Sequence, residues 1–248
     1  MALIYLLAFL LRSALGFGGL ATAITFASWL LPAHHAVLLT TVAATIPQAE
    51  IMREGIRDGD WQVSRPVILA LAISIAIGVW GFAHLSSDWF APILGGIISL
   101  IVLLDVTKSL DRLAVLLPLR APPVAFALAF VTGIIGGLSG AGGLLLLSVY
   151  LKQACHDHKS LRATGILIGG LLIIWRTVTI AVAGLLTLQL VSESLLLLPA
   201  IYLGVWMGRH ILQPEDPRRY YLLFQGVLLL SALGLMVEGA ARLISGSG

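Results

Sequence analysis

The chain has 248 residues, of which 59% are hydrophobic and 11% are charged, and its mean hydropathy is +1.02. Soluble domains carry roughly 25% charged residues, so this composition excludes a soluble enzyme, a nucleic-acid-binding protein and a disordered chain. We therefore predict an all-α integral membrane protein. Its single cysteine, Cys155, excludes an internal disulfide, and no Cys/His cluster has the spacing of a zinc site. We expect no metal and no other cofactor.

Eight apolar segments follow one another along the chain. Two of them, 2–31 and 123–154, are each interrupted by a cluster of glycines. Glycine destabilises a helix by about 1 kcal/mol per residue, so we predict that each of these two breaks into arms too short to cross a membrane. The other six are long enough to cross a hydrocarbon core of about 30 Å as helices. These six are 36–52, 66–83, 89–106, 161–182, 191–208 and 220–238.

The two halves of the chain match each other. Gly78-Val79-Trp80 matches Gly204-Val205-Trp206 at an offset of 126. The glycine clusters match at an offset of 124, where Gly16, Gly18, Gly19 and Leu20 align with Gly140, Gly142, Gly143 and Leu144. Ordered matches of this kind indicate an internal duplication, which is common in secondary transporters. We predict an N-terminal repeat over 1–106, a polar cytoplasmic linker over 107–121 and a C-terminal repeat over 122–239.

Basic residues distinguish two ways of threading the broken segments. If each segment crosses the membrane, the two sides receive seven and six Lys or Arg residues. If each turns back as a re-entrant hairpin, all Lys and Arg except Arg12, Arg176 and Arg242 lie on one side. Cytoplasmic loops carry an excess of Lys and Arg. We therefore predict two inverted repeats, each a hairpin followed by three transmembrane helices, in a multi-pass protein of the bacterial inner membrane with both termini in the periplasm.

Each predicted hairpin tip has the features of an anion site. The helix that follows the tip presents free N–H groups and the positive end of its dipole, and glycines let a ligand approach them closely. We predict that the two tips meet at the bilayer midplane and bind a small anionic substrate. The predicted tip residues are Ser13, Gly16, Gly18, Gly19, Ser139, Gly140, Gly142 and Gly143. The alternative is that these glycines only allow helices to pack closely.

Two arginines, Arg12 and Arg176, lie at membrane depth. An arginine in an apolar span usually faces a cavity and a partner, and its planar guanidinium suits carboxylate, sulfonate or phosphate oxygens. We place both arginines at the substrate site, together with the neighbouring Trp175. Snorkelling to an interface or pairing with a buried carboxylate is the alternative.

Polar side chains line one face of the predicted helix 36–52. Thr41 and Gln48 share this face at helical spacing, and we expect them to line the substrate pathway. Threonine hydroxyls that bond their own backbone are the alternative. The acidic residues near the spans, Glu50, Asp105, Glu193 and Glu238, all lie toward segment ends. Coupling to a proton or another ion therefore stays open.

Three stretches of sequence together resemble one known family of membrane proteins. They are Ser13-Ala-Leu-Gly-Phe-Gly-Gly-Leu20, the following Leu31-Pro32, and Gly136-Gly-Leu-Ser-Gly-Ala-Gly-Gly-Leu144. With the repeat and the length, they resemble the sulfite exporter TauE/SafE family, also called the toluene-sulfonate uptake permease family. The resemblance covers nearly the whole chain. One departure is Leu147-Ser148-Val149-Tyr150, where the family often has a proline.

The resemblance implies transport of sulfite, organosulfonates or related sulfur oxyanions across the bacterial inner membrane, often as export. We predict a secondary transporter and not an enzyme, because the sequence has no HExxH, no Gly-x-Ser-x-Gly and no paired carboxylates within the membrane. An anion channel of the same fold and a transporter of a carboxylate or a cation are the alternatives. The expected partners are the substrate and membrane lipid, with no nucleic acid, and the protein is expected to be a monomer or a homodimer.

Overall fold

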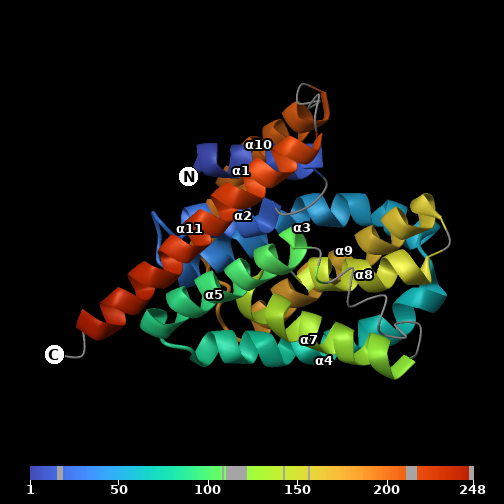
Figure 1. Cartoon of the computed structure of the whole chain (residues 1–248), viewed down its shortest axis with the longest axis horizontal. Coiled ribbons are helices and arrows are strands. Elements are labelled where there is room, and N and C mark those ends of the chain that lie inside the picture. The colour runs from blue at the N-terminus through green and yellow to red at the C-terminus, as the bar shows by residue number, and fades with distance from the viewer. Residues whose placement is uncertain are drawn as a thin grey trace.

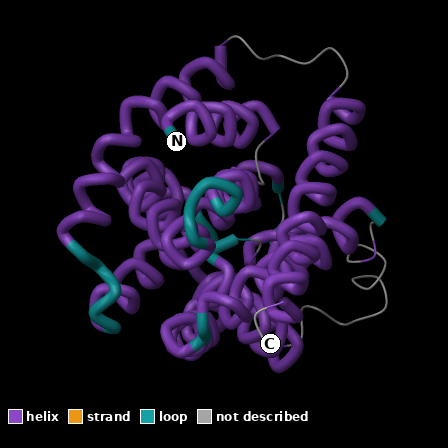
Figure 2. Tube along the Cα trace, turned by 90° about the vertical axis from the view of Figure 1, so that its left-hand side faces the viewer, coloured by secondary structure: helices purple, strands orange, loops and turns teal. Residues whose placement is uncertain are grey.

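The computed structural model describes residues 1–15, 19–107, 109, 122–141, 143–155, 157–210 and 217–245. These residues form helices and no strands (Figure 2). The first half contains α1 (Ala2–Leu15), α2 (Gly19–Ala27), α3 (Ala33–Asp58), α4 (Trp61–His84) and α5 (Ser87–Val106). The second half contains α7 (Pro122–Ser139), α8 (Gly143–Ala154), α9 (His158–Val182), α10 (Leu188–His210) and α11 (Pro217–Ser245).

The helices break at both glycine clusters, as the sequence predicts. In the first cluster, α1 ends at Leu15 and α2 begins at Gly19. In the second, α7 ends at Ser139 and α8 begins at Gly143. The structure thus describes two helices within each long apolar segment, and residues 16–18 and 142 between them lie outside the described residues.

Four helical stretches are long and apolar enough to cross a membrane: Trp61–His84, Trp89–Val106, Lys159–Val182 and Leu188–Gly208. They correspond to four of the six predicted spans. The other two predicted spans lie in longer helices with more polar ends. Span 36–52 lies in the 26-residue α3, which continues through Pro47 to a charged end, and span 220–238 overlaps the apolar run Gln225–Ala241 of α11.

Local capping explains where two of the long helices begin. The Asp60 carboxylate accepts hydrogen bonds from the backbone N–H groups of Gln62 and Val63 at the start of α4. Asp157 accepts one from the Ser160 N–H at the start of α9. Such caps satisfy N–H groups that have no partner within the helix.

Glycines bring helices from the two halves into close contact. Gly78 of α4 faces Gly137 of α7, and a Cβ added to Gly78 would lie 2.9 Å from the Gly137 Cα. Gly204 and Gly208 of α10 abut the backbone of α1 at Leu6 and Leu10. Figure 1 shows α4 beside α7 along one edge of the molecule and α1 with α10 at the opposite edge. Small residues therefore hold each broken segment against a helix of the other half.

Two further helix pairs also join the halves, and both run antiparallel. In the α3–α9 pair, Gly55 meets Leu167 while Thr45 bonds Thr177, so the residue numbers run in opposite directions. In the α5–α11 pair, Gly95 meets Ala232 and Met236, while Gly239 meets Pro92. By the same comparison α4 and α7 run parallel, since Gly133 faces Ser74 and Gly137 faces Gly78.

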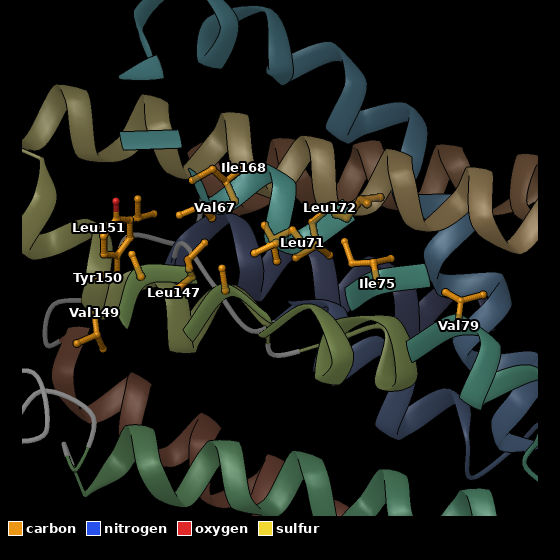
Figure 3. Close-up of a cluster of buried hydrophobic side chains, with 14 of the residues drawn as sticks. Val67, Leu71, Ile75, Val79, Leu147, Val149, Tyr150, Leu151, Ile168 and Leu172 are labelled. Carbon is orange, nitrogen blue, oxygen red and sulfur yellow. The ribbon is translucent and has the colours of Figure 1, made fainter. Parts of the chain in front are cut away.

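The buried apolar side chains form three clusters. One joins α4, α8 and α9 through residues such as Leu71, Leu147 and Leu172 (Figure 3). The second joins α1 and α2 to α3 and α10, and the third surrounds Phe82 and Phe90. Leu20, directly after the first glycine cluster, packs against all three. The first break is thus followed by a residue at the centre of the molecule.

The close contact at Gly95 predicts a difference between two neighbouring glycines. A Cβ at Gly95 would lie 2.6 Å from the Ala232 carbonyl oxygen, whereas at Gly96 the nearest atom is Met236 Sδ at 3.8 Å. Alanine improves helix propensity equally at both positions, but overpacking at Gly95 costs about 1–3 kcal/mol. We expect Gly95→Ala to melt at a lower temperature than Gly96→Ala in detergent. Equal melting temperatures would contradict the packing of α5 on α11.

Candidate anion-binding site

Helix α9 places a charged side chain in the interior of the protein. Arg176 is 1% exposed and is the largest of the fully buried side chains. Among the residues whose burial the structure describes, it is the one buried side chain that carries a formal charge. A buried charge is costly unless it is paired and hydrogen-bonded, so the surroundings of Arg176 decide what this position does.

Neutral groups hold two of the three nitrogens of this guanidinium. The Nε–H donates to the Gly137 carbonyl oxygen at 3.1 Å, and Nη1 donates to the Thr41 hydroxyl. The Cζ lies 5.9 Å from the centre of the Phe82 ring, within the range of a cation–π contact. Nη2 is buried and has no hydrogen-bond partner among the described residues. Two partners therefore orient the guanidinium, and one of its donor nitrogens has none among the described residues.

The second glycine break lies directly against this arginine. Gly140 has a φ of +73°, in the left-handed region that favours glycine. A Cβ on Gly140 would lie 2.5 Å from Arg176 Nη1, 3.1 Å from Cζ and 3.2 Å from Ile24 Cδ1. Glycine is thus required here both for the backbone conformation and for the approach of the guanidinium. Because Ile24 belongs to α2, the first broken segment also reaches this point.

The structure brings four of the predicted site residues together. These are Thr41, Ser139, Gly140 and Arg176. The Ser139 hydroxyl lies 2.7 Å from the Ile135 and Ala141 carbonyl oxygens and accepts the Ala141 N–H at 3.2 Å. It therefore stabilises the break through the local backbone instead of offering a free donor. The Thr41 hydroxyl donates to the Val37 carbonyl, so toward Arg176 it is an acceptor.

Other predicted residues lie elsewhere. Ser13 donates to the Val205 carbonyl oxygen on α10 at 3.0 Å. Trp175 is 41% exposed, and its indole donates to the Ala72 carbonyl oxygen of α4 at 2.8 Å. Gln48 is buried further along α3. Gly19 and Gly143 begin α2 and α8. Gly16, Gly18, Gly142 and the side chain of Arg12 lie outside the described residues.

Two groups at this site were not expected from the sequence. The Gly137 carbonyl lies within the second glycine cluster, and that cluster was the one signal that could have pointed to it. Phe82 shows no distinguishing pattern within the apolar run of α4. Only the packing of α4 against α7 and α9 brings its ring to the guanidinium.

The acidic residues of α3 and α10 are engaged at the helix ends. Glu193 accepts from His35 at 2.6 Å and from Gln189 at 2.7 Å. Glu54 pairs with Arg162 at 3.6 Å. Hydrogen bonds from Arg57 hold the pKa of the Asp58 carboxyl below its usual value. In the described part of the chain, no group of three or more His, Cys, Asp or Glu residues could hold a metal ion.

Membrane-length apolar helices, two helix breaks and a buried arginine between them are typical of a multi-pass membrane transporter. A family model described as Sulfite exporter TauE/SafE matches residues 1–235. The chain therefore belongs to the sulfite exporter TauE/SafE family, which is a family of transporters. Searches of curated proteins and of solved structures found no match.

Proposed function

We propose that this protein is a secondary transporter that exports sulfite, an organosulfonate or a related sulfur oxyanion across the bacterial inner membrane. The anion binds near the bilayer midplane, between the two helix breaks. The observation that carries this proposal is that Nη2 of the buried Arg176, held against the Gly140 break, has no hydrogen-bond partner among the described residues. Guanidinium–oxyanion hydrogen bonds are charge-assisted, and each contributes about 1.5–3 kcal/mol. A bound anion would supply both the missing partner and the missing countercharge.

The helix contacts support inverted repeats. Suppose that each helix of α1–α5 is replaced by its counterpart in α7–α11, and the reverse. The α4–α7 contact then becomes the α10–α1 contact, which is also present, and the α3–α9 and α5–α11 contacts stay the same. This is the pattern of a two-fold relation between the halves. Because α3 packs antiparallel to its counterpart α9, and α5 to α11, the axis of that relation is perpendicular to these helices. For helices that cross a membrane, such an axis lies in the membrane plane.

Inverted halves require each broken segment to enter and leave on the same side. Both termini then lie in the periplasm, and the 107–121 linker is cytoplasmic. The bound anion would become accessible to either side as one half rocks against the other, because the contacts between the halves are made by packed helices that can tilt as rigid bodies.

Labelling of single cysteines tests this arrangement in a Cys155→Ser background. We expect Gln62→Cys and Lys159→Cys to react with a membrane-impermeant maleimide only after spheroplasts are permeabilised. Ser86→Cys and Leu188→Cys should react in intact spheroplasts. The native side chains at all four positions are exposed and lie at or next to helix ends. If Gln62→Cys and Lys159→Cys label from opposite sides, the broken segments cross the membrane and the halves are parallel.

Counterflow in proteoliposomes tests the transport function. Vesicles loaded with unlabelled sulfite should accumulate labelled sulfite transiently, and excess organosulfonate should compete. Saturation and counterflow identify a carrier, whereas a channel only dissipates the gradient. Acetate, sodium and calcium are the negative controls. Flux of a carboxylate or of a cation, with none of sulfite or sulfonate, would overturn the proposal.

A further inference from the structure

The charges around Arg176 bear on the ionic state of the substrate. This inference rests on the function proposed above. The groups that contact the guanidinium are the Gly137 carbonyl, the Thr41 hydroxyl, the Phe82 ring and Gly140. All of them are electrically neutral. The described residues therefore supply one full positive charge at this position and no carboxylate against it.

Three acidic residues that lie near the apolar spans have other partners. Glu50 accepts from the Tyr202 hydroxyl at 2.6 Å, Glu193 from His35 at 2.6 Å and Asp105 from Gln225 at 2.7 Å. Each of these bonds joins two different helices. No such bond reaches the guanidinium of Arg176, which keeps its charge uncompensated within the described protein.

We propose that the site binds an oxyanion head group that carries one net negative charge and discriminates against dianions. A buried ion is tolerated when a partner of opposite charge neutralises it, and an unpaired buried charge costs several kcal/mol. A singly charged head group at Nη2 makes the loaded site neutral. A doubly charged head group leaves one charge unpaired in an interior whose described residues carry no buried charge other than Arg176.

Two tetrahedral anions of nearly the same size test this proposal. Methanesulfonate carries one charge at every working pH, whereas methylphosphonate changes from a monoanion to a dianion as the pH rises through its second ionisation. Affinities are measured by ligand-induced thermal stabilisation of the purified protein, which depends on ligand concentration and Kd. The measured quantity is the ratio of the two affinities at each pH, so effects of pH on the protein that are equal for both ligands cancel.

We expect the affinity of methylphosphonate relative to methanesulfonate to fall by about tenfold or more as the dianion forms. A constant ratio, or one that rises, overturns the proposal while leaving the transport function intact. That result would indicate a second cation at the site, and Arg12 would be the residue to substitute. If neither anion stabilises the protein at any pH, the proposed function itself fails, and this inference fails with it.

The Thr41→Val variant tests whether the preference depends on the net charge of the site or on the number of its hydrogen-bond donors. The substitution is nearly isosteric and removes the acceptor of Arg176 Nη1, so it frees donors without changing the charge of the site. We expect the preference for the monoanion to persist in this variant. If the dianion then binds as tightly as the monoanion, the number of donors sets the preference, and the proposal is wrong. Thr45→Val, in which the lost hydroxyl bonds Thr177, is the matched control one turn away.

Discussion

Replacing Arg176 with glutamine is expected to weaken substrate binding by about 10- to 100-fold and to abolish transport at low substrate concentration. A hydrogen bond to a charged group contributes about 1.5–3 kcal/mol, and about 1.4 kcal/mol corresponds to a tenfold change in affinity. Glutamine keeps a planar polar head but loses the charge. The measurement is ligand-induced thermal stabilisation, followed by counterflow in proteoliposomes.

The stability of the ligand-free variant distinguishes this effect from misfolding. Arg176 is buried without a carboxylate partner among the described residues, so removing its charge relieves a desolvation cost. We expect the ligand-free melting temperature of Arg176→Gln to stay the same or to rise. A variant that melts normally and binds substrate with wild-type affinity would contradict the role of Arg176.

Arg162→Gln is the matched control for this experiment. Arg162 lies on the same helix as Arg176, α9. Its side chain is 71% exposed and pairs with Glu54 of α3 at 3.6 Å. Exposed ion pairs of this kind contribute about 0–1 kcal/mol. We expect this variant to bind and transport like the wild type. Arg176→Lys tests the geometry, since lysine keeps the charge without the planar guanidinium.

Replacing Gly140 with alanine is expected to lose substrate binding with only a moderate loss of stability. The left-handed backbone costs an L-residue about 1–2 kcal/mol, and the new Cβ would lie 2.5 Å from Arg176 Nη1. Because Nη1 is the end of a flexible side chain, the arginine moves away instead of the helices. We expect Nη2 then to be displaced from its proposed position toward the substrate.

Gly184→Ala separates the strain of the backbone from the displacement of the arginine. Gly184 has a φ of +72°, nearly the same as Gly140, but an added Cβ there meets no atom within 4 Å. Both alanine variants should melt at similarly lowered temperatures. Only Gly140→Ala should lose the ligand-induced stabilisation. If both variants bind substrate equally well, the contact between Gly140 and Arg176 has no part in binding.

The site is asymmetric although the proposed repeats are related. At offsets of 124 and 126, the positions that correspond to Arg176 in the first half are Met52 and Glu50. Met52 packs against Gly170, and Glu50 bonds Tyr202 at an exposed position. Among the described residues, the first half therefore contributes Thr41, Ile24 and Phe82 to the site but no charged side chain equivalent to Arg176.

Local features of the sequence were enough to predict the class of the protein and the positions of its breaks. Few charges and long apolar runs determine the membrane class, because they depend only on composition and on consecutive residues. The glycine clusters end α1 at Leu15 and α7 at Ser139 for a similar reason, since helix propensity is a property of the local chain. A charge within the apolar span 161–182 likewise drew attention to Arg176.

Tertiary structure alone decided which groups meet this arginine. Thr41 is separated from Arg176 by 135 positions, and only the antiparallel packing of α3 on α9 brings them together. Helix rotation decided between Arg176 and Trp175, since neighbouring residues point about 100° apart. Because of the packing, Trp175 donates to Ala72 and Ser13 donates to α10. The Ser139 hydroxyl bonds the local backbone of the second break. Contact between distant helices depends on their register and rotation, which no local pattern encodes.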